Sequence, residues 1–118
     1  MYRATIIAKN KRGNREEIGT IYQDIDENEW WFDTNDERAQ KELEQIKELD
    51  SIPHRTVLNK DGRTYEVLME ITPDDYLFFQ ALNMYIIGNM KRIYEIRVEE
   101  TEDTIEGARA MIDRAASM

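Results

Sequence analysis

The chain has 118 residues and no cysteine, and its 25 acidic against 16 basic residues give a formal net charge of −9. A chain of this length is expected to form one domain, residues 1–118, and to bury a core without disulfides or metal ions. The missing thiols exclude disulfides, thiolate metal sites and cysteine nucleophiles, and the net charge disfavours general binding to nucleic acid.

The N-terminal residues enter an alternating pattern directly, without an apolar leader segment. No apolar run approaches the roughly 20 residues that a membrane span needs. We therefore expect a soluble, cytoplasmic protein that has no membrane partner.

The first 32 residues predict two or three strands. Apolar and polar residues alternate over Tyr2–Lys9, and Gly13 lies in a turn over Asn10–Asn14. The return strand is expected at about Glu16–Ile25, and a short third strand at Glu29–Phe32.

A helix is expected next, capped by Asp33, Thr34 or Asn35 and ended by Pro53. Its single narrow apolar stripe predicts a helix that lies on a surface, and the stripe consists of Ala39, Leu43, Ile46 and Leu49.

The clearest hairpin in the sequence joins Arg55–Lys60 to Arg63–Ile71. Between them, Asp61 and Gly62 form a two-residue turn of a composition that favours type I′ geometry. On the second strand one face is expected to carry Tyr65, Val67, Met69 and Ile71.

The second half of the chain predicts two more helices and one strand. The segment Thr72–Asp75 has the composition of a helix start, and the helix is expected at about Pro73–Ile87, with Gly88 and Asn89 as its stop. It is apolar nearly all round, which predicts a central buried helix or a subunit interface. A strand over Arg92–Glu99 follows, with Tyr94, Ile96 and Val98 inward. Thr101 or Thr104 then caps a last helix that carries Ile105, Ala108, Met111, Ile112 and Ala115.

The predicted element order is therefore β-β-(β)-α-β-β-α-β-α. Because hairpins dominate, we expect an α+β fold with a mostly antiparallel sheet of five or six strands and three helices.

An acidic segment around two tryptophans, Asp24–Glu37, partly matches the ligand spacing of a calcium loop. Numbered from Asp24, the loop has Glu29 at position 6, where an EF-hand needs glycine, and Asn35 at position 12, where it needs a bidentate glutamate. The segment therefore predicts an acidic turn that leads into a helix cap, and we expect no metal site.

Trp30 and Trp31 are neighbours on a predicted strand, so they point to opposite faces of the sheet. If helices cover only one face, one tryptophan is exposed or lies in an interface, where tryptophan is common. The alternative is a tryptophan that lies over the sheet edge and packs against long charged side chains.

Two basic segments are the candidates for an anion site. Lys11, Arg12 and Arg15 surround a flexible glycine in the first turn, and His54 and Arg55 stand where the long hairpin begins. The phosphate-loop patterns GxxxxGK[ST] and GxGxxG are both absent, and charged hairpin tips are common because they keep sheet edges soluble.

We find no catalytic residues in the sequence. His54 is the only histidine, and the two serines, Ser51 and Ser117, do not stand in a nucleophile-elbow setting. We therefore expect a non-enzymatic protein without a cofactor.

The sequence favours a small acidic protein that acts by protein–protein contact, with a basic-surfaced partner or with itself as a homodimer. An inhibitor that imitates nucleic acid with its carboxylates belongs to this class. The alternative is a module that binds an anionic small molecule such as a nucleotide. Such a ligand would lie near Lys11, Arg12, Arg15, His54 and Arg55, with Trp30 or Trp31 stacked on it.

Overall fold

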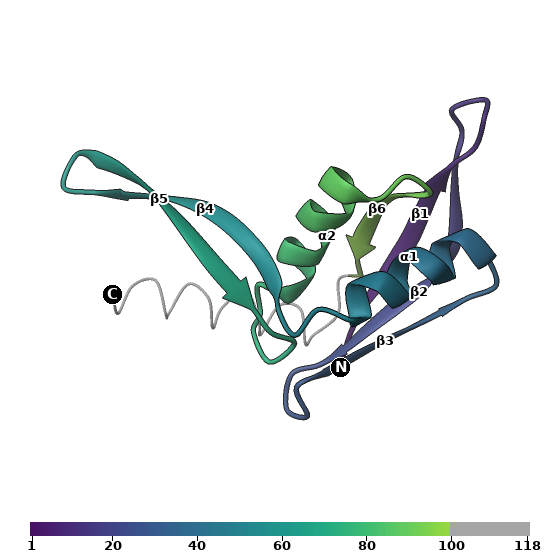
Figure 1. Cartoon of the computed structure of the whole chain (residues 1–118), viewed down its shortest axis with the longest axis horizontal. Helices are drawn as coiled ribbons and strands as arrows, with labels where there is room; N and C mark the ends of the chain where they lie inside the picture. The colour runs from purple at the N-terminus through teal and green to yellow at the C-terminus, as the bar shows by residue number, and fades with distance from the viewer. Residues whose placement is uncertain (100–118) are drawn as a thin grey trace.

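The computed structural model describes residues 1–99, which fold into six strands and two helices (Figure 1). The elements follow one another as β1 (Tyr2–Lys9), β2 (Arg15–Asp24), β3 (Glu29–Thr34), α1 (Glu37–Lys47), β4 (Ile52–Lys60), β5 (Arg63–Ile71), α2 (Phe78–Asn89) and β6 (Ile93–Val98). This confirms the α+β class and the antiparallel pairing. The third predicted helix lies outside the described residues.

The strands form two sheets, which corrects the expectation of one sheet of five or six strands. Four strands pair antiparallel in the order β3-β2-β1-β6, and β4 and β5 pair antiparallel in a separate two-stranded sheet. The β4–β5 hairpin, which we call the arm, projects away from the four-stranded sheet (Figure 1). The radius of gyration of 15.2 Å accordingly exceeds the ~13 Å expected of a compact chain of about 100 residues.

One face of the four-stranded sheet is covered by both helices (Figure 1). Ala4, Ile6 and Ile21 on this face are fully buried. They share one core with the inward residues of the helices, which are Ala39, Leu43, Ile46, Phe78, Phe79, Ala81, Leu82 and Ile86. The alternating pattern of β1 therefore identified the core face correctly.

Strand β6 departs from the predicted alternation because of a β-bulge. Ile7 of β1 pairs with Glu95, and the next residue, Ala8, pairs with Ile93, so Tyr94 is left without a partner in the ladder. A bulge shifts the side-chain alternation by one residue. Ile93 is buried as a result, and Tyr94, which was predicted to point inward, is exposed. Ile96 is buried as predicted, whereas Val98, at the end of the strand, is exposed.

Helix α1 begins later and ends earlier than predicted. Asp36 is the N-cap, and its side chain accepts a hydrogen bond from the backbone N–H of Ala39 at 2.9 Å. The helix ends at Lys47, so Leu49 lies beyond the buried stripe and is exposed, and Pro53 belongs to β4.

Helix α2 begins at Phe78 rather than at Pro73. The buried side chain of Gln23 donates hydrogen bonds to the carbonyls of Pro73 and Asp75, at 2.7 and 2.8 Å. These contacts hold the predicted helix start in a turn against β2. Neither helix of residues 1–99 is long and apolar enough to cross a membrane.

Candidate functional site

The arm has one face that is apolar along most of its length. The hairpin turn at Asp61 and Gly62 has positive φ at both residues, as type I′ geometry requires, and it fixes the register. The cross-strand pairs on this face are Ile52–Ile71, His54–Met69, Thr56–Val67 and Leu58–Tyr65.

The core covers only the base of this apolar face. Ile52, Ile71 and His54 are buried, but Leu58 and Tyr65, near the tip, are 48% and 46% exposed. The apolar pattern thus continues beyond the part of the arm that the core and α2 cover.

The opposite face of the arm mixes apolar and charged side chains. Val57 is 60% exposed and Leu68 is 66% exposed. Between them lies an exposed ion pair, in which Nε of Arg55 is 3.0 Å from a carboxylate oxygen of Glu66. Both faces of the arm therefore present apolar side chains outward.

Helix α2 continues this apolar surface onto the rest of the molecule. Met84 and Ile87 on its outer side are 58% and 56% exposed. Met84 and Leu68 line one open pocket of about 270 Å³ at the junction of the arm and α2, together with Pro53, His54, Arg55, Tyr85 and Asn89. We call the exposed apolar set the arm surface; it comprises Val57, Leu58, Tyr65, Leu68, Met84 and Ile87.

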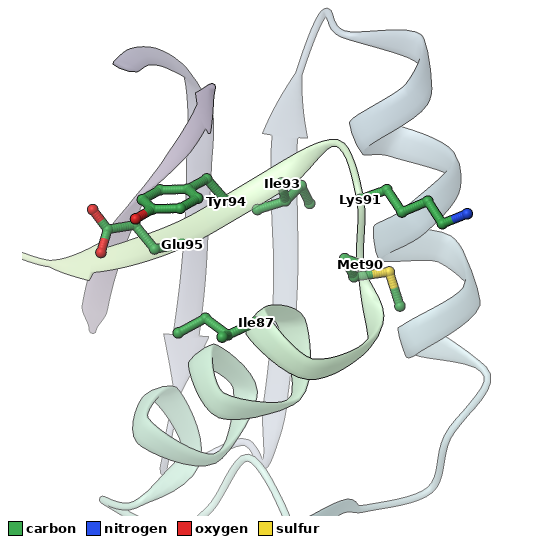
Figure 2. Close-up of a pocket in the computed structure, with 6 residues that line it drawn as sticks. All are labelled: Ile87, Met90, Lys91, Ile93, Tyr94 and Glu95. Atoms are coloured by element: carbon green, nitrogen blue, oxygen red, sulfur yellow. The ribbon is translucent and has the colours of Figure 1, made fainter. Parts of the chain in front are cut away.

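A second depression, of about 210 Å³, lies between the end of α2 and the start of β6 (Figure 2). Ile87, Tyr94 and Glu95 border it, and the ammonium group of Lys91 points away from Tyr94 and Glu95 (Figure 2). Ile87 thereby joins the arm surface to this depression.

Charge is distributed unevenly along the chain. Residues 24–50 contain eleven acidic and three basic residues, a net charge of −8. The arm, residues 52–71, contains three of each and is neutral apart from its histidine. The exposed acids of the first segment lie on the β2–β3 turn, β3, α1 and the residues after it: Asp26, Glu27, Glu29, Asp33, Glu37, Glu44, Glu48 and Asp50. We call this set the acidic edge.

The perturbed ionisable groups belong to contacts that hold α1 in place. Arg92 donates two hydrogen bonds to Asp36, at 2.6 and 2.9 Å, and these bonds are the main reason that the pKa of Asp36 lies below its ordinary value. They likewise raise the pKa of Arg92. Burial lowers the pKa of Lys47, whose ammonium group lies over the Trp30 ring and donates to the Trp30 carbonyl.

The residues of the predicted anion site lie on separate surfaces. Figure 1 shows the β1–β2 turn, which carries Lys11 and Arg12, on the far side of α2 from the arm. The guanidinium of Arg15 lies 4.9 Å from the centre of the Tyr94 ring. His54 is buried in β4, and Arg55 pairs with Glu66.

Trp30 and Trp31 point to opposite faces of the sheet, as neighbours on a strand must. Trp30 is buried under α1 and Lys47, whereas Trp31 is partly exposed and stacks on Tyr22, with the ring centres 5.5 Å apart. The structure does not bring the seven predicted residues together, and a common anionic ligand stays a prediction.

Sequence reasoning missed the arm surface. The available signal was the composition of the long hairpin, which carries large apolar residues on both faces although α+β hairpins commonly have one polar face. For metals, no group of three or more histidine, aspartate or glutamate side chains that could hold an ion occurs in the described part of the chain.

Comparison with known proteins supplies no relative. No protein-family model matches the chain, and no curated protein or solved structure is significantly similar to it.

Proposed function

We propose that the protein acts by protein–protein contact through the arm surface, without catalysis. The single observation that carries this proposal is the exposure of six large apolar side chains on the arm and α2, each at least 46% exposed. Leu68 of the arm and Met84 of α2 line one pocket, and contiguous exposed apolar residues mark interaction sites in proteins.

The shape of the arm supports the proposal. A two-stranded hairpin alone is at best marginally stable in water, and additional strands or a covering element are needed to stabilise it. Beyond its base, most arm residues are exposed, so the rest of residues 1–99 supplies little cover. A bound protein would supply the missing contacts.

The acidic edge supports a separate contact, with a basic-surfaced protein. Eight exposed carboxylates on neighbouring elements produce a negative field that accelerates encounter with a basic protein and repels nucleic acid. A protein whose basic site normally binds nucleic acid is one partner of this kind.

Two matched substitutions test the proposal. Leu68→Glu changes the arm surface, and Leu49→Glu places the same charge at an exposed leucine after α1, outside the arm surface. The tagged wild type and each tagged variant are expressed in separate cultures, each together with a wild-type copy that carries a different tag. Each tagged chain is then purified, and the proteins that accompany it are quantified by mass spectrometry.

We expect Leu68→Glu to lose the associated protein, or the second copy, that wild type and Leu49→Glu retain. Circular dichroism shows whether each variant is folded, and Met84→Glu on α2 replaces Leu68→Glu if that variant is not. If a folded arm-surface variant retains as much of the associated protein as Leu49→Glu does, the proposal is contradicted.

A further inference from the structure

The outer edge of β5 is unpaired within residues 1–99. In the described part of the chain, the sheet of the arm contains β4 and β5 alone, and α2 packs against β4, on the other side of the hairpin. Strand β5 has nine residues without proline, and three of them, Arg63, Glu66 and Glu70, are charged. A long unpaired strand edge can pair with another strand, and proteins usually block or cover such edges.

We propose that β5 pairs antiparallel with β5 of a second copy of this chain, about a two-fold axis at Val67. The result is a continuous sheet in the order β4-β5-β5-β4, two strands from each copy. This inference rests on the proposed function, because it names the partner of the arm.

The sequence of β5 is complementary to itself in this register. Val67 is the middle residue of Arg63–Ile71 and stands opposite its own counterpart. On the apolar face, Tyr65 of each copy is opposite Met69 of the other, and on the mixed face Glu66 is opposite Leu68. Thr64 is opposite Glu70, and Arg63 is opposite Ile71, so no like charges stand directly opposite each other.

Neighbouring registers are worse. An axis at Glu66 places that carboxylate opposite its own copy, and an axis at Leu68 places Glu66 opposite Glu70. Like charges directly opposite each other destabilise a strand pair. A two-fold axis that passes between two neighbouring residues pairs each residue with one of the opposite parity. Because side chains alternate with a period of two, the apolar face of one arm would then continue into the mixed face of the other.

The charge distribution permits the arms of two copies to come together. Two copies with a net charge of −9 repel each other, but each arm has three acidic and three basic residues. The arm also projects away from β3 and α1, which carry four acids of the acidic edge, Glu29, Asp33, Glu37 and Glu44 (Figure 1). Charges separated by more than the Debye length of about 8 Å are largely screened at physiological ionic strength.

The pairing also completes the arm as a structural unit. A sheet of three or more strands with an apolar face is stable, whereas two strands alone are marginal. The joined sheet has four strands, and its apolar face carries Leu58, Tyr65, Val67 and Met69 from each copy.

Cysteine cross-linking tests the register, because the wild-type chain has no cysteine. Residues directly opposite each other in an antiparallel pair have Cα atoms about 4.5–5.5 Å apart, within the range that a disulfide spans. We expect Val67→Cys to form a covalent dimer as its main product under mild oxidation. Val57→Cys, on the exposed part of β4, is the control and should stay largely uncrosslinked. Equal cross-linking of both variants, or of neither, would overturn the proposed pairing.

A charge pair tests the same axis without a disulfide. Val67→Glu and Val67→Lys each place like charges opposite each other, so each should be monomeric in sedimentation velocity while the wild type is dimeric. Mixed in equal amounts, the two variants should form a heterodimer that native mass spectrometry identifies by its mass. Folded variants that stay monomeric when mixed would overturn the inference.

The outcome also separates this inference from the proposed function. A monomeric wild type whose Leu68→Glu variant still loses a different associated protein refutes the β5 pairing and leaves the arm surface as a contact site. A monomeric wild type whose Leu68→Glu variant loses nothing refutes both.

Discussion

The four-stranded sheet and the arm both contain strands with an apolar face, with different results. In β1, Ala4 and Ile6 are fully buried, because two helices cover that face. In the arm, one face is apolar and the other is mixed, and burial decreases from the base to the tip. The comparison shows that alternation determines which side of a strand is apolar, whereas another element must decide whether that side is covered.

Polar contacts differ between the two regions in the same way. In the four-stranded part, the carboxylate of Glu42 accepts hydrogen bonds from the backbone N–H groups of Lys91, Arg92 and Ile93, at 2.8–3.0 Å. These bonds fasten α1 to the start of β6. The ion pair of the arm, Arg55 with Glu66, joins two exposed side chains that are 71% and 60% accessible. Glu42 thus connects a helix to a strand, whereas the Arg55–Glu66 pair faces solvent.

The largest expected difference is between the same substitution in the two regions. Leu43→Ala opens a cavity at a fully buried position in α1 and should lower the free energy of unfolding by about 2–5 kcal/mol. Leu68→Ala, at a position that is 66% exposed, should change the unfolding of the isolated chain by no more than about 0.5 kcal/mol. Urea unfolding at low protein concentration measures both values. A large effect of Leu68→Ala under those conditions would show that the isolated arm packs like a core.

Two glycines, one in each region, are constrained for different reasons. A Cβ atom added to Gly19 of β2 would lie 2.4 Å from the carbonyl oxygen of Asp33 and 2.8 Å from Cβ of Thr34, so the two strands must move apart. At Gly62, in the turn of the arm, the added atom meets no atom of residues 1–99 within 4 Å, but φ is +73°. We expect Gly19→Ala to cost about 1–3 kcal/mol by overpacking, and Gly62→Ala to cost about 1 kcal/mol by backbone strain.

Asparagine separates these two causes. Asn tolerates positive φ, so Gly62→Asn should recover most of the stability that Gly62→Ala loses, whereas Gly19→Asn should be worse than Gly19→Ala. Thermal unfolding of the four variants measures the effects. Equal recovery at both positions would indicate that backbone conformation, not space, limits Gly19.

Local features of the fold could be predicted from the sequence. The turn at Asp61 and Gly62, the strands beside it and the first hairpin depend on neighbouring residues, and the structure confirms them. The start of α2 could not be predicted, because it depends on Gln23, which is 50 residues before Pro73. The bulge at Tyr94 likewise depends on the pairing of β6 with β1.

The candidate site could be predicted less well than the fold. Residue type indicated an anion site at Lys11, Arg12, Arg15, His54 and Arg55, but only the topology reveals that the arm and the β1–β2 turn lie on different sides of α2. The arm surface could not be recognised from residue type. Its residues read as ordinary strand and helix positions, and their exposure follows from the separation of the arm from the four-stranded sheet.

The smallest expected difference is between the ion pairs of the two regions. Asp36 and Arg92 are each about one-fifth exposed, at 20% and 19%, and are joined at 2.6 Å. Asp36→Asn keeps a side-chain acceptor for the helix cap and removes the charge, so it should cost about 1 kcal/mol at neutral pH. Arg55→Gln removes the exposed pair of the arm and should cost only a few tenths of a kcal/mol, since solvent screens such a pair.

The pH dependence identifies the source of the loss in Asp36→Asn. Because Arg92 holds the pKa of Asp36 below its ordinary value of 3.8, the folded state binds a proton at Asp36 less readily than the unfolded state does. The stability that Asp36 contributes is therefore fully present above pH 3.8 and is lost as the pH falls through the lower pKa of the folded state. Unfolding measured from neutral to acid pH should show the Asp36→Asn curve approaching the wild-type curve in acid, while Arg55→Gln stays parallel to wild type. A constant gap between Asp36→Asn and wild type would assign the loss to the helix cap, and the two regions would then not differ in the contribution of their ion pairs.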